Sequence, residues 1–166
     1  MKSAMPSKRR GGFRRKSGSG GVTKRRTKTA FETLTEKLDD IFSKFIRLRD
    51  AHDWHQKHPE AAFGYVSCCT CGIIRDWKEV DCGHYIGRRS HNTRWEEFNC
   101  HAQCKGCNCN EGKKPEYGLY LQQRYGPEII ERLVIAGKRV KSWAPIELEA
   151  LIVHYTQEVE KLKHGG

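Results

Sequence analysis

Two cysteine pairs constrain the fold of this chain more than any other feature of its sequence. Cys68 and Cys71 form one CxxC pair, Cys104 and Cys107 form another, and about thirty residues separate the two. Each pair can form a tight turn that offers two thiolates to one ion, and four thiolates complete a tetrahedral zinc site. Such a closed site is structural, because no coordination position is left for a substrate. We therefore predict one structural zinc ion that ties two distant segments together.

Four further cysteines leave alternatives for the ligand set open: Cys69, Cys82, Cys100 and Cys109. Cys69 and Cys109 lie beside ligands and could exchange with them, and His101 with Cys104 could form a different pair in place of Cys107. Four cysteines also suit an iron–sulfur cluster, although nothing else in the sequence suggests electron transfer. Burial as small hydrophobic side chains explains surplus thiols but does not explain two CxxC pairs.

The positive charge of the chain belongs to its N-terminal segment. The 166 residues carry a net charge of +11, and residues 1–28 contain eleven Lys and Arg and no acid, so the rest is balanced. With few apolar residues and several Gly and Ser, this segment reads as a disordered basic tail suited to the phosphate backbone of nucleic acid. A solvated leader or an expression remnant is the alternative. The arginines predicted to contact DNA are Arg9, Arg10, Arg14, Arg15, Arg25 and Arg26.

Membrane and secreted classes are disfavoured by the same composition. No apolar run approaches the roughly 20 residues of a membrane span, and no signal-peptide core follows Met1. Eight cysteines without an export signal favour a reducing cytoplasm and metal binding over disulfides. The mean hydropathy of −0.78 indicates a modest core that depends on a metal for stability. We expect a cytoplasmic protein with no membrane partner.

Residues 29–60 predict an N-terminal helix and a linker. Apolar side chains recur at three-to-four spacing between charges over 29–53. Thr33 or Thr35 could cap this helix, with Glu36 in capping-box register to Thr33. Three histidines follow at a spacing of three, and a polar helix end or loop is favoured over a metal site for them: His52, His55 and His58.

Residues 61–114 predict the metal-containing core, and residues 115–166 predict C-terminal helices. The core pattern indicates short strands near 65–71, 73–85 and 98–103, with a basic loop over 87–95. Pro and Gly positions divide the remainder into helices near 115–125, 127–136 and 145–163. The apolar stripe of the last helix could pack on its own domain or form a homodimer.

A candidate catalytic site lies between the cysteine pairs. Asp81 and His84 are predicted at or beside a strand end, and Asn108 directly follows the last cysteine. Mg²⁺ takes one or two protein oxygens and keeps several waters, so the Asp81 carboxylate and the Asn108 amide oxygen would suffice as ligands. His84, neutral near pH 7, could deprotonate a water that attacks phosphorus while the metal stabilises the phosphate charge. The alternative is an ordinary surface histidine, but its position within a metal-tied loop favours a functional role.

Three segments jointly resemble the phage NinG/Rap recombination family. They read DCGHY at 81–85, RWEEFN at 94–99 and QCKGCN at 103–108. The resemblance runs from about residue 41 to about 133, continues toward the last helix, and does not cover the basic tail. This family contains structure-selective nucleases with a zinc-containing HNH-like (ββα-metal) core. The resemblance therefore implies an α+β fold with such a core and flanking helices.

Residues 107–112 also resemble the end of the core of phage endonuclease VII, a resolvase of four-way junctions. These resemblances assign roles to five residues. Asp81 and Asn108 would be metal ligands, and His84 would be the catalytic histidine. Asn99 would orient the loop that carries His84, and Glu111 would be an acid near the metal. Two positions depart from HNH nucleases. Gly83 precedes the histidine where many have an acid, and Asn108 stands where many have a second histidine.

The resemblance implies a metal-dependent, structure-selective DNA endonuclease that acts on branched recombination intermediates such as Holliday junctions and D-loops. Its cofactors would be structural zinc and catalytic Mg²⁺ or Mn²⁺, and a phage protein of this kind would act in the host cytoplasm. Arg88, Arg89 and Arg94 beside the site are candidate phosphate contacts, or alternatively residues of a solvated loop. Two other functions stay open, namely an HNH nuclease of restriction or homing type on duplex DNA and a non-catalytic zinc-ribbon module that binds nucleic acid.

Overall fold

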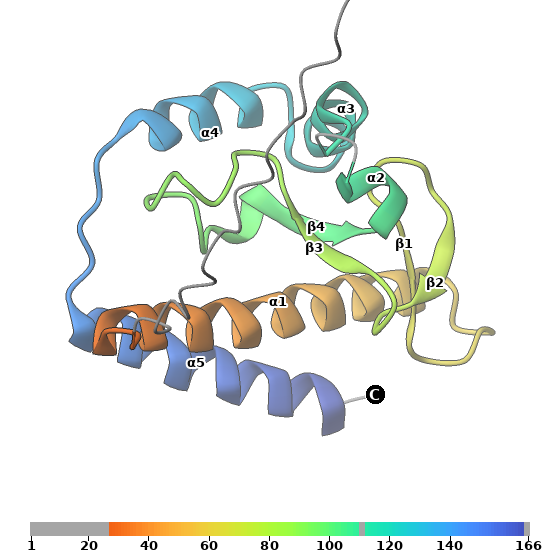
Figure 1. Cartoon of the computed structure of the whole chain (residues 1–166). Coiled ribbons are helices and arrows are strands. Elements are labelled where there is room, and N and C mark those ends of the chain that lie inside the picture. Colours follow the sequence, from red (N-terminus) through yellow and green to blue (C-terminus); the bar gives the residue numbers. More distant parts are fainter. Residues whose placement is uncertain (1–26, 110–111, 165–166) are drawn as a thin grey trace, which may run out of the picture.

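The computed structural model describes residues 27–109 and 112–164, and it has a mixed α+β fold (Figure 1). The longest helices are α1 (Ala30–Lys57) and α5 (Pro145–His164), and the shorter ones are α2 (Lys105–Cys109), α3 (Lys114–Tyr125), α4 (Ile129–Lys138) and the 3-10 turn η1 (Glu97–Asn99). The strands are β1 (Tyr65–Ser67), β2 (Ile74–Asp76), β3 (Asp81–His84) and β4 (Cys100–Gln103). The expected α+β class is thus confirmed.

Helix α1 begins at Ala30, as the predicted range of 29–53 indicated, but it extends to Lys57 and has a different cap from the one predicted. Thr29 is its N-cap: the Glu32 N–H donates to the Thr29 hydroxyl at 3.1 Å, and the Thr29 N–H donates to the Glu32 carboxylate at 2.8 Å. The capping box is therefore Thr29 and Glu32, and the prediction of Thr33 or Thr35 as the cap was wrong. Those two hydroxyls instead donate to backbone carbonyls four residues back, because both residues already lie within the helix.

Two small antiparallel hairpins form the β structure. Strand β1 pairs with β2, and strand β3 pairs with β4 in a register that places Asp81 opposite Gln103 and His84 opposite Cys100. The short helix α2 follows β4 at once, so the chain runs strand–strand–helix through this part of the molecule. The register matters for function, because it decides which of the candidate side chains share a face.

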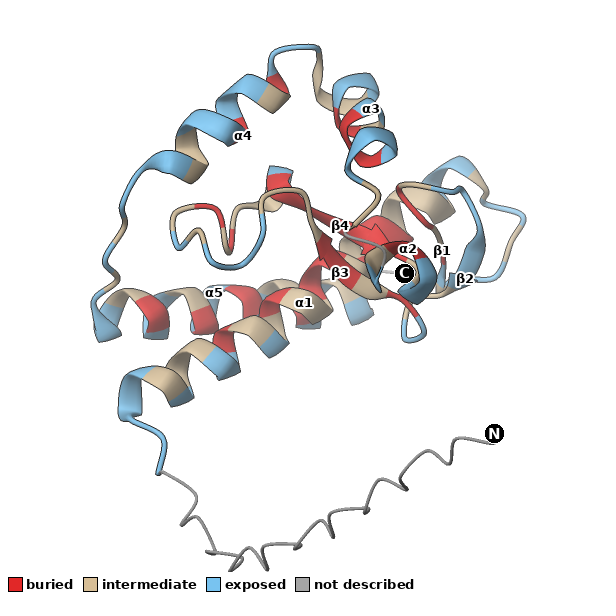
Figure 2. Ribbon diagram, turned by 45° about the horizontal axis from the view of Figure 1, so that its top comes forward, coloured by how far each residue is buried: buried red, intermediate tan, exposed pale blue. Residues whose placement is uncertain are grey.

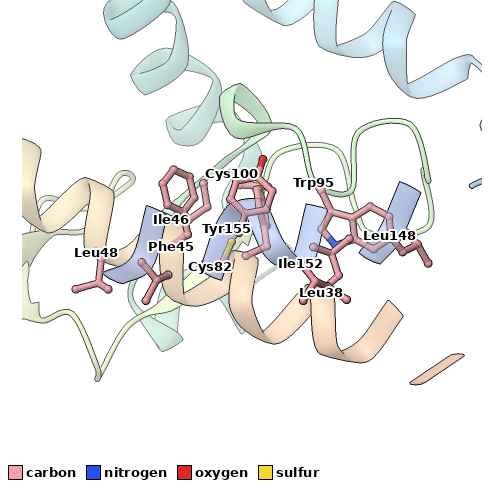
Figure 3. Close-up of a cluster of buried hydrophobic side chains, with 12 residues drawn as sticks. Leu38, Phe45, Ile46, Leu48, Cys82, Trp95, Cys100, Leu148, Ile152 and Tyr155 are labelled. Carbon is pink, nitrogen blue, oxygen red and sulfur yellow. The ribbon is translucent and has the colours of Figure 1, made fainter. Parts of the chain in front are cut away.

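The hairpin β3–β4 lies between two helical layers (Figures 1 and 2). Helices α1 and α5 cover one side, where Phe42 and Phe45 pack edge-on or tilted against Tyr155 with ring centroids 4.9 and 5.0 Å apart. Figure 3 shows this cluster, which also includes Cys82 and Cys100 from the hairpin. Helices α3 and α4 bury a second cluster on the other side, around Tyr117 and Leu121. Strand β4 is buried along its whole length as a result.

The apolar stripe of α5 packs within its own chain. Leu148, Ile152, Tyr155 and Val159 are all buried, and α5 lies along α1 (Figure 2). A homodimer stays a prediction, but this stripe is already used by the core. Among the residues described, no helix combines the length and apolarity needed to cross a membrane.

Helix α4 starts two residues later than predicted, at Ile129. Gly126 adopts φ +92°, and Pro127 with Glu128 completes the turn before the helix. The three histidines near the end of α1 do not converge on one point: the rings of His52 and His55 contact Phe63, and His58 stacks on Trp54. The interpretation of this stretch as a polar helix end is confirmed.

Candidate metal and catalytic site

The four predicted cysteine ligands come together in one cluster. Their Sγ atoms all lie within 4.8 Å of one another, and the Sγ atoms of Cys71 and Cys104 are 3.8 Å apart. A tetrahedron with Zn–S bonds of about 2.3 Å has edges of about 3.8 Å, so the cluster fits a metal such as zinc. We call Cys68, Cys71, Cys104 and Cys107 the four-cysteine cluster.

Local turns build this cluster. After Cys71, Gly72 adopts φ +73° and donates its N–H to the Cys68 carbonyl at 2.9 Å, which closes the first turn. The Cys104 N–H donates to the Cys68 sulfur at 3.2 Å. Burial would raise the pKa of the Cys68 thiol, but the Thr70 hydroxyl and backbone N–H donors outweigh burial and lower it to about 6. These donors favour the thiolate form, which is the form that binds a metal.

The alternative ligands are placed elsewhere. Cys69 is buried against Tyr117, and burial raises the pKa of its thiol. His101 is fully buried, with Nδ1 3.1 Å from the Asp50 carboxylate and Nε2 3.1 Å from the Tyr125 hydroxyl. Cys109 is exposed at the end of α2. The CxxC assignment is thus the one that the geometry supports.

Asp81 and Asn108 meet beside the four-cysteine cluster. Asp81 is the first residue of β3, Asn108 lies in α2, and the Asn108 amide nitrogen donates to the Asp81 carboxylate at 3.0 Å. A rotation of the Asn108 amide by 180° would replace this donor with the amide oxygen, an arrangement that a cation between the two side chains would stabilise. The pair therefore offers two oxygen ligands of the kind that Mg²⁺ prefers.

His84 stands at the other end of β3 with both ring nitrogens near carbonyl oxygens. Nε2 lies 3.0 Å from the Arg94 oxygen and Nδ1 lies 3.2 Å from the Cys82 oxygen. Burial, together with the charge of Arg88, lowers the pKa of His84, so the ring is neutral near pH 7 and has one N–H. We assign this proton to Nε2, the nitrogen with the shorter contact, which leaves a lone pair on Nδ1.

Asn99 fixes the loop that holds His84 in place. Its side chain is fully buried, its oxygen accepts the Ile86 N–H at 2.7 Å, and its amide nitrogen donates to the Ile86 and Thr93 carbonyls at 2.9 Å. Thr93 directly precedes Arg94, whose carbonyl contacts His84. The position agrees with the orienting role that the resemblance implies for Asn99.

Position 83 requires glycine, because a side chain there would clash with Gln103. A Cβ at this position would lie 2.9 Å from the Cβ of Gln103 and would overlap the rest of that side chain. The Gly83 carbonyl also accepts the Tyr117 hydroxyl at 3.0 Å. The acid that many HNH nucleases carry before the histidine therefore has no room in this hairpin.

Two adjoining hollows of about 400 and 460 Å³ open beside these residues. Asp81 lines the first, His84 lines the second, and Cys82, Arg88 and Asn108 line both. Five basic side chains surround them: Arg47, Lys78, Arg88, Lys105 and Lys114. Of these five residues, only Arg88 was predicted from the sequence. The other four come from α1, α2, α3 and the β2–β3 turn, and no local pattern indicates that these elements meet at the site.

The other predicted arginines differ in their surroundings. Arg88 and Arg89 are exposed in the loop after β3. Arg94 is held by Asp39 of α1, with its Nε donating at 2.9 Å, so its guanidinium is already engaged. Glu111 and the tail arginines Arg9 to Arg26 lie outside the described residues.

Comparison with known proteins yields one match. A family model described as the bacteriophage lambda NinG protein matches residues 7–165, which is nearly the whole chain. The match reaches into the basic N-terminal segment, beyond the limits that the sequence motifs had indicated. No match to the chain was found among curated proteins or among solved structures.

Proposed function

Because this chain belongs to the family of the bacteriophage lambda NinG protein, we propose that it is a metal-dependent, structure-selective DNA endonuclease. Its substrates would be branched recombination intermediates such as four-way junctions and D-loops. One observation carries the proposal: a carboxylate, an amide and a neutral histidine line adjoining hollows ringed by five basic side chains. The order β3–β4–α2 supports an HNH-like core, and the four-cysteine cluster would hold a structural zinc ion.

His84 is the proposed general base. With Nε2–H donated to the Arg94 carbonyl, Nδ1 is unprotonated and would take a proton from water, which requires a small turn of the ring away from the Cys82 carbonyl oxygen 3.2 Å from Nδ1. A pKa lowered by burial and by Arg88 keeps the ring unprotonated at neutral pH, so it can accept that proton. Asn99 contributes by fixing the loop, since a tilted imidazole would miss the water.

Asp81 and Asn108 are the proposed ligands of Mg²⁺ or Mn²⁺. Such an ion, when bound, stabilises negative charge on the phosphate and on the leaving oxygen. The surrounding cations would hold the DNA backbone against this site, with Arg88 central because it lines both hollows. The basic N-terminal segment would add affinity without reading a sequence.

The decisive experiment is a cleavage assay with Mg²⁺ on four DNA substrates: a four-way junction, a flap, a single strand and a linear duplex. We expect cleavage of branched DNA, and loss of at least about 100-fold in rate for Asp81→Ala. Glu79→Ala is the matched control, because Glu79 is an exposed acid two residues away.

Other outcomes would select other functions. Preferred cleavage of linear duplex would indicate a restriction or homing nuclease. DNA binding without cleavage of any of the four substrates would replace the enzyme with a nucleic-acid-binding module.

A further inference from the structure

The face of the β3–β4 hairpin that packs toward α1 carries a second group of metal-binding side chains. Cys82 and His84 are two residues apart in β3, so their side chains lie on the same face of the strand. On β4, Cys100 is the residue that pairs with His84. The two sulfur atoms and a ring nitrogen of His84 all lie within 4.8 Å of one another. Both cysteines belong to the buried cluster shown in Figure 3.

We propose that Cys82, His84 and Cys100 form a second site for a thiophilic divalent cation such as Zn²⁺, and that a cation bound there withdraws His84 from hydrolysis. The inhibitory part rests on the proposed function, whereas the metal site itself does not.

The ligand chemistry selects zinc over magnesium. Two thiolates and an imidazole are soft or borderline ligands, while Mg²⁺ requires oxygen. Zinc bonds of about 2.3 Å to sulfur and about 2.0 Å to nitrogen place ligand atoms about 3.5–3.8 Å apart, so distances within 4.8 Å need to shorten by at most about 1.3 Å. Three protein ligands leave a fourth position for water or another oxygen, and the Arg94 carbonyl oxygen lies 3.9 Å from the Cys100 sulfur.

The surroundings of His84 already match those of a zinc-bound histidine. A metal-bound imidazole usually donates its other N–H to a carbonyl or carboxylate, which fixes the ring. Whichever nitrogen of His84 binds the cation, the other one faces a backbone carbonyl, that of Cys82 or that of Arg94.

A cation can reach this site from solvent, and two thiolates would balance the charge of a divalent cation. Cys82 and His84 line the hollow of about 460 Å³, which gives the cation a path from solvent. Burial and the neighbouring Cys82 raise the pKa of the Cys100 thiol well above its ordinary value, so a cation bound there would have to displace the thiol proton.

A cation on His84 would stop the proposed hydrolysis in either coordination mode. Bound at Nδ1, it occupies the lone pair that would accept the water proton. Bound at Nε2, it replaces the hydrogen bond to the Arg94 carbonyl and turns the ring from its catalytic position. The four-cysteine cluster would be unaffected in both cases, because different residues form it.

The binding test measures zinc per chain by elemental analysis after dialysis of the full chain against excess zinc and removal of unbound metal. We expect two zinc ions in the wild type and in Cys109→Ser, an exposed control, but one in Cys100→Ser. Ser is nearly isosteric with Cys and is a poor zinc ligand, so the fold should persist; Cys82→Ala is a second variant, also expected to bind one. A single zinc ion in the wild type, or two in both variants, would overturn the site.

The inhibition test adds zinc to cleavage reactions that contain Mg²⁺. Zinc at concentrations that fill the second site should reduce wild-type cleavage at least about 10-fold and leave Cys100→Ser nearly unaffected. Equal inhibition of both proteins would overturn the inhibitory role, because zinc would then act at another place such as Asp81. If no DNA is cleaved at all, the proposed function fails while the zinc count still decides the site.

Discussion

The four-cysteine cluster and the Asp81–Asn108–His84 site are neighbours that both include residues of α2, but they are held in different ways. Local turns position the sulfur ligands, with Gly72 closing the first turn onto Cys68. The catalytic candidate His84 is instead positioned from a distance, through the Arg94 carbonyl and the loop that Asn99 anchors. The first region is therefore a property of short sequence segments, whereas the second depends on the folded domain around it. A substitution that disrupts the four-cysteine cluster should therefore also impair the Asp81–Asn108–His84 site, whereas a substitution in that site should leave the cluster intact.

The largest expected effect is that of Cys71→Ser. Cys71 is exposed, so the loss of its sulfur removes a metal ligand without opening a cavity. We expect loss of the bound zinc, loss of amide hydrogen-exchange protection over residues 65–112, and loss of cleavage. Cys109→Ser, also exposed, should change none of the three. A Cys71→Ser protein that keeps full zinc and protection would show that the cluster does not hold the fold.

His84→Ala tests the reverse direction. The rate should fall by at least about 100-fold while zinc in the four-cysteine cluster, exchange protection and binding to a four-way junction are retained. Wild-type cleavage by this variant would place the general base elsewhere. Unfolding of the hairpin would show instead that the two regions support each other.

The effect of Asn99→Ala on stability and cleavage should lie between the effects of Cys71→Ser and His84→Ala. It removes three hydrogen bonds from a buried loop, which costs about 2–4 kcal/mol of unfolding free energy. Cleavage should fall less than for His84→Ala, because the ring remains but is less well oriented. Urea unfolding and single-turnover kinetics measure the two effects, and Asn92→Ala, which loses one bond to the Ala136 carbonyl, is the control. An unchanged rate would separate the loop from catalysis.

Acid should weaken β4, the strand that joins the two regions. Burial opposes ionisation of Asp50, but His101, Arg49 and the Ala102 N–H outweigh it and lower the pKa of Asp50 below the ordinary 3.8. Burial lowers the pKa of His101 below 6.5. Both shifts mean that the unfolded chain binds more protons, so stability should fall as pH drops from about 6.5 to below 3.8, by about 1.4 kcal/mol per pKa unit. Urea midpoints across this range test it, and Asp50→Asn should flatten the acid limb.

The smallest expected effect is that of deleting the N-terminal segment, which belongs to neither region. Deletion of residues 1–26 leaves the Thr29 cap of α1 intact and should preserve zinc content and turnover at saturating DNA. Junction affinity should fall at low salt, and its dependence on salt should flatten because fewer counterions are released. An unchanged salt slope would exclude contact between this segment and DNA.

The same contrast explains what the sequence could and could not predict. The CxxC ligands and the helix from Pro145 follow from spacing, since local turns and periodicity determine them. The placement of Asp81 near Asn108 was expected because Asp81 lies in the metal-tied loop and Asn108 directly follows the last cysteine ligand. The contact between Arg94 and Asp39 joins loop to helix across 55 positions, and no local pattern indicates it. The meeting of Cys82 with Cys100 depends on the β3–β4 register, because a shift by one residue would turn Cys100 to the other face.

The pairing of α1 with α5 has a consequence for how the protein is made. These are the first and last helices of the described chain, yet they lie side by side (Figure 1). During translation, Phe42 and Phe45 emerge roughly a hundred residues before Tyr155, the aromatic residue against which they pack. A chain interrupted before α5 would already contain both cysteine pairs but would expose its core to chaperones and proteases. Completion of the core thus has to wait for the synthesis of α5.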